Sequence, residues 1–281
     1  MRRVAILAAA ALALAAGPLA AQDTLQRLRD TGELRLGYRV DALPLSFVDD
    51  AGVPAGYTVE VCEDVGEKLR LALDLERLEL LFVPVDTGDS LAAVTEGRVD
   101  LLCGATTVTI ERRESVDFSL PTFVDGAAVL MPAGATPDIE ALAGQRLGVR
   151  RSTTTEEALR ATLAERGMEA EIVPFDEHQA GRDALAAGEI AAYFGDQSIL
   201  IGLILTSGAP ETFMLSNEML TVEKQALAMP RGDGDFRLAV DRALSELYIS
   251  GRMQQILETT LPGVEPGLAL RALFLIAPDL L

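Results

Sequence analysis

The feature that most constrains the fold of this chain is a regular alternation of strand-like and helix-like segments. Short runs rich in Val and Leu alternate with longer segments in which apolar residues recur at helical spacing. Such alternation is typical of α/β proteins with mostly parallel sheets, and we expect that fold class. The expected strands are residues 33–38, 80–85, 99–103, 127–131, 146–150, 170–174, 191–194 and 224–229. The expected helices are residues 58–73, 90–96, 154–166, 179–187, 197–205, 236–249 and 252–260.

Two segments are candidates for connections between lobes. They are residues 130–134 and the strand that ends at Met229 and Pro230, and each runs from a strand into chain containing Pro or Gly. If both cross, residues 131–227 form a second lobe inserted into a first lobe made of residues 22–130 and 228–281. The composition equally allows two sequential domains.

The N-terminus predicts a cleavable signal peptide, residues 1–21. Two arginines precede an Ala- and Leu-rich run at residues 4–16, which is too short to cross a bilayer. Small residues follow, and we expect cleavage after Ala21. No Cys directly follows the apolar run, so we expect no lipid anchor. The most apolar later segment, residues 199–205, is far too short for a membrane span and predicts a buried helix.

The charge and the cysteines narrow the function classes further. A formal net charge of −19 argues against nucleic acid and anionic membranes as partners. Any Arg cluster that binds an anion must therefore be local and sheltered. In an exported protein, Cys62 and Cys103 predict a disulfide, with two buried free thiols as the alternative. A bond that closes a loop of about 40 residues would stabilise the fold by about 4 kcal/mol.

The segment after the third expected strand combines hydroxyl residues with an arginine. Thr106 and Thr107 follow the strand, and Arg112 comes shortly afterwards. A planar guanidinium group with hydroxyl or backbone donors nearby suits an α-carboxylate. The carboxyl ends of strands are also where open α/β sheets bind ligands. An isolated turn with a solvated arginine is the alternative interpretation of this segment.

Four blocks of sequence resemble the periplasmic substrate-binding proteins of amino-acid ABC transporters, especially the glutamate/aspartate-binding branch. They are GYRVDALPLSFVDDAGVPAGYTVEVC (37–62), VDLLCGATTVTIERRESVDFSLPTF (99–123), GVRRSTTTEEAL (148–159) and DEHQAGRDALAAGEIAAYFGDQSIL (176–200). The resemblance implies a type II periplasmic-binding-protein fold, in which two α/β lobes joined by two crossing strands close on the ligand. It also implies a periplasmic, non-enzymatic protein that passes its ligand to an ABC transporter permease, and we expect a monomer.

The same resemblance assigns the α-amino-acid end of the ligand. Arg112 would bind the α-carboxylate with help from Thr107. The backbone near Ala105, together with Asp196 from the other lobe, would accept from the α-ammonium group, which needs carboxylate and carbonyl acceptors. Asp196 also precedes the expected helix at residues 197–205, where it can serve as the N-cap, and both roles can hold.

Recognition of the ligand side chain would fall to Arg39, Thr153 and His178. A carboxylate next to His178, the only histidine, would raise its pKa and keep it charged. The chain departs from the glutamate/aspartate branch at two positions. Ser90 stands where that branch has a second Arg, and Arg150 stands beside Arg151 where a hydroxyl residue is expected.

These departures leave the identity of the ligand open. If Arg150 replaces the missing cation, an acidic ligand is favoured. If Arg150 faces solvent, glutamine or asparagine becomes the alternative. Leu45 at an expected aromatic position disfavours a bulky aromatic ligand.

An enzyme is the rival class, because dehydratases also use this fold. The sequence lacks GxSxG, GxGxxG and phosphate-loop motifs. A single His and two cysteines that we expect to be bonded disfavour zinc, so we expect neither metal nor cofactor. The segment RGDGDF at residues 231–236 predicts a polar turn before a helix. A membrane-receptor sensor would need a transmembrane segment or a separate partner. The apolar stretch at residues 267–281 has partly helical spacing and should pack on a lobe, with contact to a partner as the alternative.

Overall fold

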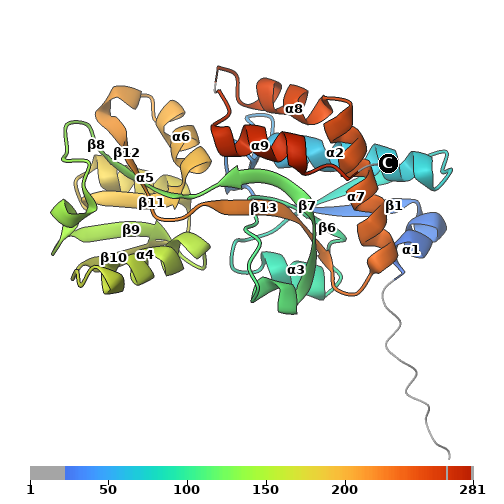
Figure 1. Ribbon diagram of the computed structural model, residues 1–281, viewed down its shortest axis with the longest axis horizontal. Coiled ribbons are helices and arrows are strands. Elements are labelled where there is room, and N and C mark those ends of the chain that lie inside the picture. The colour runs from blue at the N-terminus through green and yellow to red at the C-terminus, as the bar shows by residue number, and fades with distance from the viewer. Residues whose placement is uncertain (1–22, 264, 280–281) are drawn as a thin grey trace, which may run out of the picture.

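The chain folds around two five-stranded sheets, each at the centre of one lobe (Figure 1). The computed structural model describes residues 23–263 and 265–279, so the expected signal peptide lies outside the described residues. The strand orders are β5-β1-β6-β13-β7 in the first sheet and β10-β9-β11-β8-β12 in the second. The predicted α/β class is confirmed.

The first lobe combines parallel and antiparallel strands. β1 pairs in parallel with β5 and β6, whereas β13 pairs antiparallel with β6 and β7. The strands are β1 (Glu33–Tyr38), β5 (Glu79–Pro84), β6 (Leu101–Cys103), β7 (Val116–Asp125) and β13 (Glu223–Pro230). The helices are α1 (Thr24–Thr31), α2 (Tyr57–Ala72), α3 (Ser90–Thr95), α7 (Gly234–Ile249), α8 (Arg252–Thr260) and α9 (Leu268–Ile276). A small sheet joins β2 (Asp41–Ala42), β3 (Ser46–Val48) and β4 (Pro54–Ala55).

The second lobe has the same layered organisation. β9 pairs in parallel with β10 and β11, and β8 pairs antiparallel with β11 and β12. The strands are β8 (Ala127–Pro132), β9 (Arg146–Arg150), β10 (Glu171–Phe175), β11 (Ala192–Asp196) and β12 (Phe213–Met219). The helices are α4 (Thr154–Glu165), α5 (His178–Ala186) and α6 (Gln197–Leu205). α6 buries Ile199 and Leu200, as expected. Among the described residues, no helix combines the length and apolarity that a bilayer span requires.

The first connection between the lobes is not where the sequence predicted it. β7 belongs to the first sheet and β8 to the second, so the chain crosses at Gly126. The predicted crossing at residues 130–134 is wrong, because Pro132 lies at the far end of β8 and pairs with Phe213 of β12. A Cβ on Gly126 would lie 2.1 Å from the carbonyl oxygen of Thr221, so the glycine lets the two connections pass closely.

The second connection runs from β12 to β13. All of β13 belongs to the first sheet, where Glu223 pairs with Asp125 of β7. The lobe boundary expected between residues 227 and 228 therefore falls inside β13. The sequence predicted this strand at residues 224–229, whereas β13 begins one residue earlier, at Glu223.

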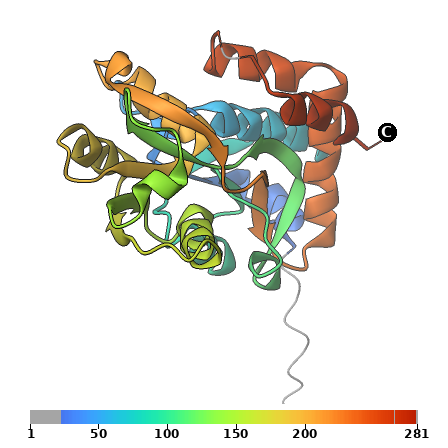
Figure 2. The same cartoon turned by 60° about the vertical axis from the view of Figure 1, so that its left-hand side comes forward.

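The C-terminal segment packs on the first lobe, as predicted. α9 buries Leu270 and Leu273 in the large apolar core that also holds residues of α2, α7 and α8. Figures 1 and 2 show the red C-terminal helices on the outer side of this lobe in both views. Leu268 and Leu275 on the opposite face of α9 are exposed.

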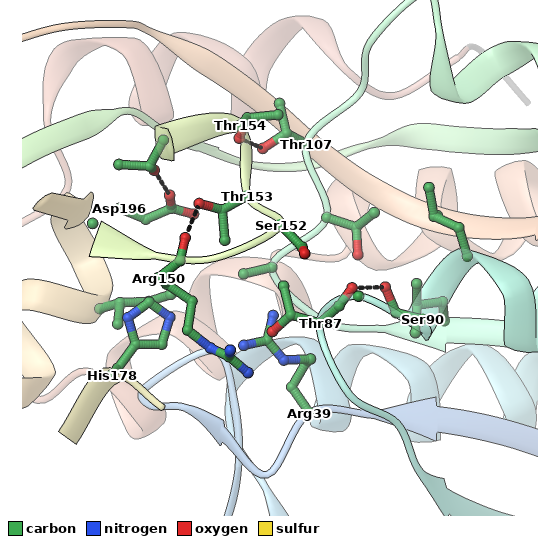
Figure 3. A pocket seen from close by; sticks show the side chains of 18 of the residues that line it. Arg39, Thr87, Ser90, Thr107, Arg150, Ser152, Thr153, Thr154, His178 and Asp196 are labelled. Atoms are coloured by element: carbon green, nitrogen blue, oxygen red, sulfur yellow. Dashed lines mark hydrogen bonds between the residues drawn. The ribbon is translucent and has the colours of Figure 1, made fainter. Parts of the chain in front are cut away.

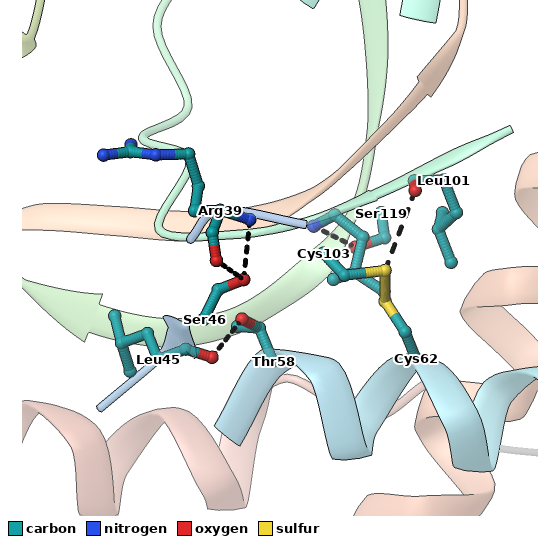
Figure 4. Close-up of a disulfide and its surroundings, with 9 residues drawn as sticks. Arg39, Leu45, Ser46, Thr58, Cys62, Leu101, Cys103 and Ser119 are labelled. Atoms are coloured by element: carbon teal, nitrogen blue, oxygen red, sulfur yellow. Dashed lines mark hydrogen bonds between the residues drawn. A yellow bond between two sulfur atoms is a disulfide. The ribbon is translucent and has the colours of Figure 1, made fainter. Parts of the chain in front are cut away.

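The predicted disulfide is present and joins a helix to a strand (Figure 4). Cys62 lies in α2 and Cys103 ends β6, with their Cα atoms 6.1 Å apart. Both cysteines are fully buried, and the alternative of two free thiols is wrong. The bond fixes the end of β6, from which the loop towards Arg112 begins.

Candidate functional site

A cavity of about 160 Å³ lies between the two lobes. An apolar cavity of similar size holds a benzene molecule, so this volume suits a small organic ligand. All eight residues expected at the ligand site line this cavity, although they come from distant parts of the sequence. They are Arg39, Ala105, Thr107, Arg112, Arg150, Thr153, His178 and Asp196. Figure 3 labels all of them except Ala105 and Arg112.

Arg112 begins a short 3-10 helix after the loop that follows β6. Its Nη1 donates to the carbonyl oxygen of Thr107 at 2.9 Å, which leaves other guanidinium donors available. Burial lowers the pKa of Arg112, although the carboxylates of Glu157 and Glu223 oppose this. Among the described residues, no carboxylate forms an ion pair with this guanidinium group. A partly buried cation in this state is suited to an anionic ligand group.

Thr107 is less available to a ligand than the sequence suggested. Its hydroxyl donates to Glu223 Oε2 at 2.6 Å, and the hydroxyl of Thr154 from the other lobe donates to the same oxygen at 3.0 Å. A ligand carboxylate would have to compete with Glu223 for the Thr107 proton. Ala105 lines the cavity beside this loop.

Asp196 ends β11 and occupies the N-cap position of α6, but its side chain makes no capping hydrogen bond. The carboxylate instead accepts from the Thr155 hydroxyl at 3.1 Å and from Gln225 Nε2 at 2.8 Å. Burial, followed by repulsion from Glu223, raises the pKa of Asp196 to about 6. A cationic ligand group beside this carboxylate would relieve both effects.

Arg39 and Arg150 approach each other from opposite lobes (Figure 3). Both are almost completely buried, so Arg150 does not face solvent. Asp41, which the sequence analysis did not single out, joins them. Its Oδ1 accepts from Arg39 Nη2 at 2.5 Å, and its Oδ2 lies 3.2 Å from Arg150 Nε. Its position two residues after Arg39, in one of the four recognised blocks, was the available signal.

His178 begins α5 and lies beside this pair, where burial and Arg39 act against the positive charge that a partner carboxylate would favour. Complete burial, followed by the positive charge of Arg39, lowers the pKa of His178 to about 3. Its Nδ1 lies 3.0 Å from the hydroxyl of Tyr193. When that hydroxyl donates, the imidazole proton lies on Nε2, and neutral His178 still offers one N–H donor.

Two further threonines, Thr153 and Thr87, line the cavity. Thr153 is the N-cap of α4, where it accepts from the backbone N–H of Glu156 at 3.1 Å and donates to the carbonyl of Arg150 at 2.8 Å. Its side chain therefore holds the turn next to Arg150. Thr87, which the sequence analysis missed, lines the cavity, and its buried hydroxyl has no hydrogen-bond partner among the described residues.

A second buried carboxyl group lies next to the first connection between the lobes. Asp125 ends β7 and accepts from the hydroxyl of Ser198 and from the backbone N–H of Gly126, the latter at 2.9 Å. Burial, followed by repulsion from Asp196, raises the pKa of Asp125 to about 7. Its charge state therefore changes within the neutral range.

This shift predicts how stability depends on pH. A carboxyl group whose pKa is higher in the folded state contributes stability at low pH, and this contribution is lost as pH rises from about 4 towards 7. Asp125→Asn removes the titration and keeps a similar shape. The free energy of unfolding of the variant, minus that of the wild type, should therefore rise by on the order of 3 kcal/mol from pH 4.5 to pH 7.5. Urea unfolding without added ligand would measure this difference. A difference that does not vary with pH would contradict the shift.

Comparisons with known proteins agree with this architecture. Residues 34–262 match the family model of bacterial extracellular solute-binding proteins, family 3. An L-glutamate/L-aspartate-binding protein of Pseudomonas aeruginosa is 28% identical over 249 residues, covering 87% of this chain and 82% of the relative. The L-cystine-binding protein TcyJ of Escherichia coli is 26% identical over 263 residues, covering 91% of this chain and 94% of the relative. The solved structure of a solute receptor for L-cysteine of Neisseria gonorrhoeae has a TM-score of 0.74 and 26% identity, covering 86% of this chain and 97% of the receptor chain. The resemblance found in the sequence is thereby confirmed, and the chain belongs to the bacterial extracellular solute-binding proteins of family 3.

Proposed function

We propose that this protein binds an acidic amino acid, glutamate or aspartate, in the periplasm and delivers it to the permease of an ABC transporter. One observation carries the proposal. The cavity is lined by Arg112, which has no carboxylate ion-pair partner among the described residues, by the half-buried carboxylate of Asp196, and by two buried arginines, Arg39 and Arg150. An acidic amino acid carries an α-carboxylate, an α-ammonium group and a side-chain carboxylate. These charges are opposite in sign to those of Arg112, of Asp196 and of the Arg39 and Arg150 pair, in that order.

The α-amino-acid end of the ligand fits Arg112 and Asp196. The guanidinium donors of Arg112 that Thr107 does not use would take the α-carboxylate. The carboxylate of Asp196 would accept from the α-ammonium group. Because Arg112 belongs to the first lobe and Asp196 to the second, one ligand links both. Its binding energy would therefore favour the closed arrangement of the lobes.

The side-chain end of the ligand fits Arg39 and Arg150, with neutral His178 as a further donor. Arg150 supplies from the second lobe the positive charge that Ser90 cannot supply from the first. Arg39 and Arg150 share Asp41 as a partly buried counter-ion, so one of their two positive charges is not neutralised by it. Burying that charge costs free energy unless a second anion, such as a ligand carboxylate, binds beside it. The glutamate/aspartate-binding relative from P. aeruginosa is consistent with an acidic ligand.

A neutral polar amino acid such as glutamine or asparagine is the second candidate. The observation that favours it is Asp41, which already neutralises one of the two guanidinium charges. The remaining N–H donors could then bind an amide oxygen. An affinity that does not distinguish glutamate from its amide would support this alternative.

Turnover would support the enzyme alternative, and it can be tested separately from affinity. The protein should be saturated with glutamate, incubated and denatured, and the released amino acid should then be quantified by mass. We expect stoichiometric recovery of unchanged glutamate. Progressive loss of glutamate or appearance of a dehydrated product would contradict a transport role.

Arg39→Met should reduce the preference for acidic ligands. The substitution removes one of the two positive charges and leaves Asp41 to neutralise Arg150. We expect the affinity for glutamate to fall by about 10- to 100-fold and that for glutamine to change much less. The matched control is Arg151→Met, because Arg151 is exposed and pairs with Asp176 outside this cavity. Equal losses for glutamate and glutamine in Arg39→Met would show that Arg39 does not recognise the side-chain charge.

A further inference from the structure

Asp41 is the one carboxylate that contacts both buried arginines of the side-chain subsite among the described residues. It lies in β2 of the small three-stranded sheet, where its backbone pairs with Phe47 of β3. Asp41 is not among the residues that line the cavity, whereas Arg39 and Arg150 are. The carboxylate therefore contacts both guanidinium groups without lining the cavity, and it lines a neighbouring cavity together with Arg150.

Asp41 is ionised at neutral pH. Burial alone would raise its pKa, but the neighbouring cationic side chains, Arg39 first among them, together outweigh that effect, so the pKa lies below its usual value. His178 is neutral at the same pH because burial lowers its pKa to about 3. Arg39 and Arg150 together with Asp41 thus leave a single positive charge in excess. That charge matches one ligand carboxylate.

A second carboxylate near Arg150 lacks these properties. Asp86 Oδ1 lies 3.6 Å from Arg150 Nη2, but the side chain of Asp86 is 84% exposed, against 15% for Asp41. Water and salt screen an exposed charge far more than a buried one. Asp86 therefore contributes little to the potential inside the cavity and serves as a natural comparison for Asp41.

We propose that Asp41 is a specificity-determining residue, a fixed counter-anion that sets the net charge of the side-chain subsite and thereby limits its preference for an anionic over a neutral side chain. This proposal rests on the proposed function, since it assumes that the ligand side chain lies against Arg39 and Arg150. Without the negative charge of Asp41, the subsite would carry two positive charges. A glutamate carboxylate would then gain an attraction that a glutamine amide does not.

The test compares Asp41→Asn with the wild type and with Asp86→Asn by calorimetric titration of glutamate and glutamine at pH 7. The measured quantity is the ratio of the glutamate to the glutamine association constant. Both ligands close the same lobes, so any change in the energy of closure cancels in this ratio. We expect the ratio to rise at least about tenfold in Asp41→Asn and to change less than about threefold in Asp86→Asn.

The outcomes separate this inference from the proposed function. A wild type that prefers glutamine, with a ratio that still rises in Asp41→Asn, would contradict the acidic ligand but support Asp41 as the counter-anion. A wild type that prefers glutamate, with an unchanged or lower ratio in Asp41→Asn, would overturn the inference and leave the proposed function intact. An equal rise in Asp86→Asn, or loss of both ligands in Asp41→Asn, would also overturn it.

Discussion

Replacing Arg112 by alanine should weaken amino-acid binding by about two to four decades without unfolding the protein. Arg112 is the cation proposed to hold the α-carboxylate, and within the described part of the chain its side chain donates to the backbone oxygen of Thr107 alone. Truncating one partner of a desolvated charge pair costs about 3–5 kcal/mol. Isothermal titration would measure the loss, and circular dichroism would verify the fold.

The adjacent arginine provides a matched control for this experiment. Arg113 lies over the ring of Phe118, 5.6 Å from its centre, and does not line the cavity. Arg113→Ala should keep the wild-type affinity. If Arg112→Ala lost less than tenfold in affinity, or if Arg113→Ala lost as much, Arg112 would not hold the α-carboxylate.

Removing the disulfide should have the largest effect on stability. Replacing both Cys62 and Cys103 by alanine opens a link between residues 41 positions apart, which is expected to cost about 4 kcal/mol of unfolding free energy. Urea unfolding under oxidising conditions would measure the difference. Non-reduced, denatured wild-type protein should contain no thiol that reacts with an alkylating reagent.

Reduction of the wild type is the control for the double substitution. A reducing agent should destabilise the wild type by a similar amount and leave the double-alanine variant unchanged. A loss below about 1 kcal/mol, or two reactive thiols in the denatured wild type, would show that the bond does not form in solution.

Much of the fold was predictable because burial imposes regular spacing on the sequence. β9 and α6 have the predicted bounds, since Leu147 and Val149 of β9 stand alone between two arginines, whereas α6 is a longer apolar run with turn residues at its ends. β7 was missed because Pro121 and several polar residues interrupt its apolar pattern. The first crossing was misplaced because Pro132 and Gly134 mark the end of a strand inside the second sheet as readily as a hinge.

The site was predictable as a set of residues but not as a set of charges. Motif positions were enough to gather residues as distant as Arg39 and Asp196 around one cavity. The charge of His178 and the role of Asp41 depend on distances through space and on burial. The sequence gives neither, so the effect of burial and of Arg39, which lower the pKa of His178, could not be predicted from it.

The most direct test of the account is the affinity of the wild-type protein for glutamate against glutamine at neutral pH. Titration calorimetry of the ligand-free protein with each amino acid, in the same buffer and salt, would supply both constants. Arg39 and Arg150, together with Asp41, leave one positive charge in excess beside the ligand, so we expect glutamate to bind at least about tenfold more tightly. Glutamine bound as tightly as glutamate would contradict the claim that this protein selects an acidic amino acid.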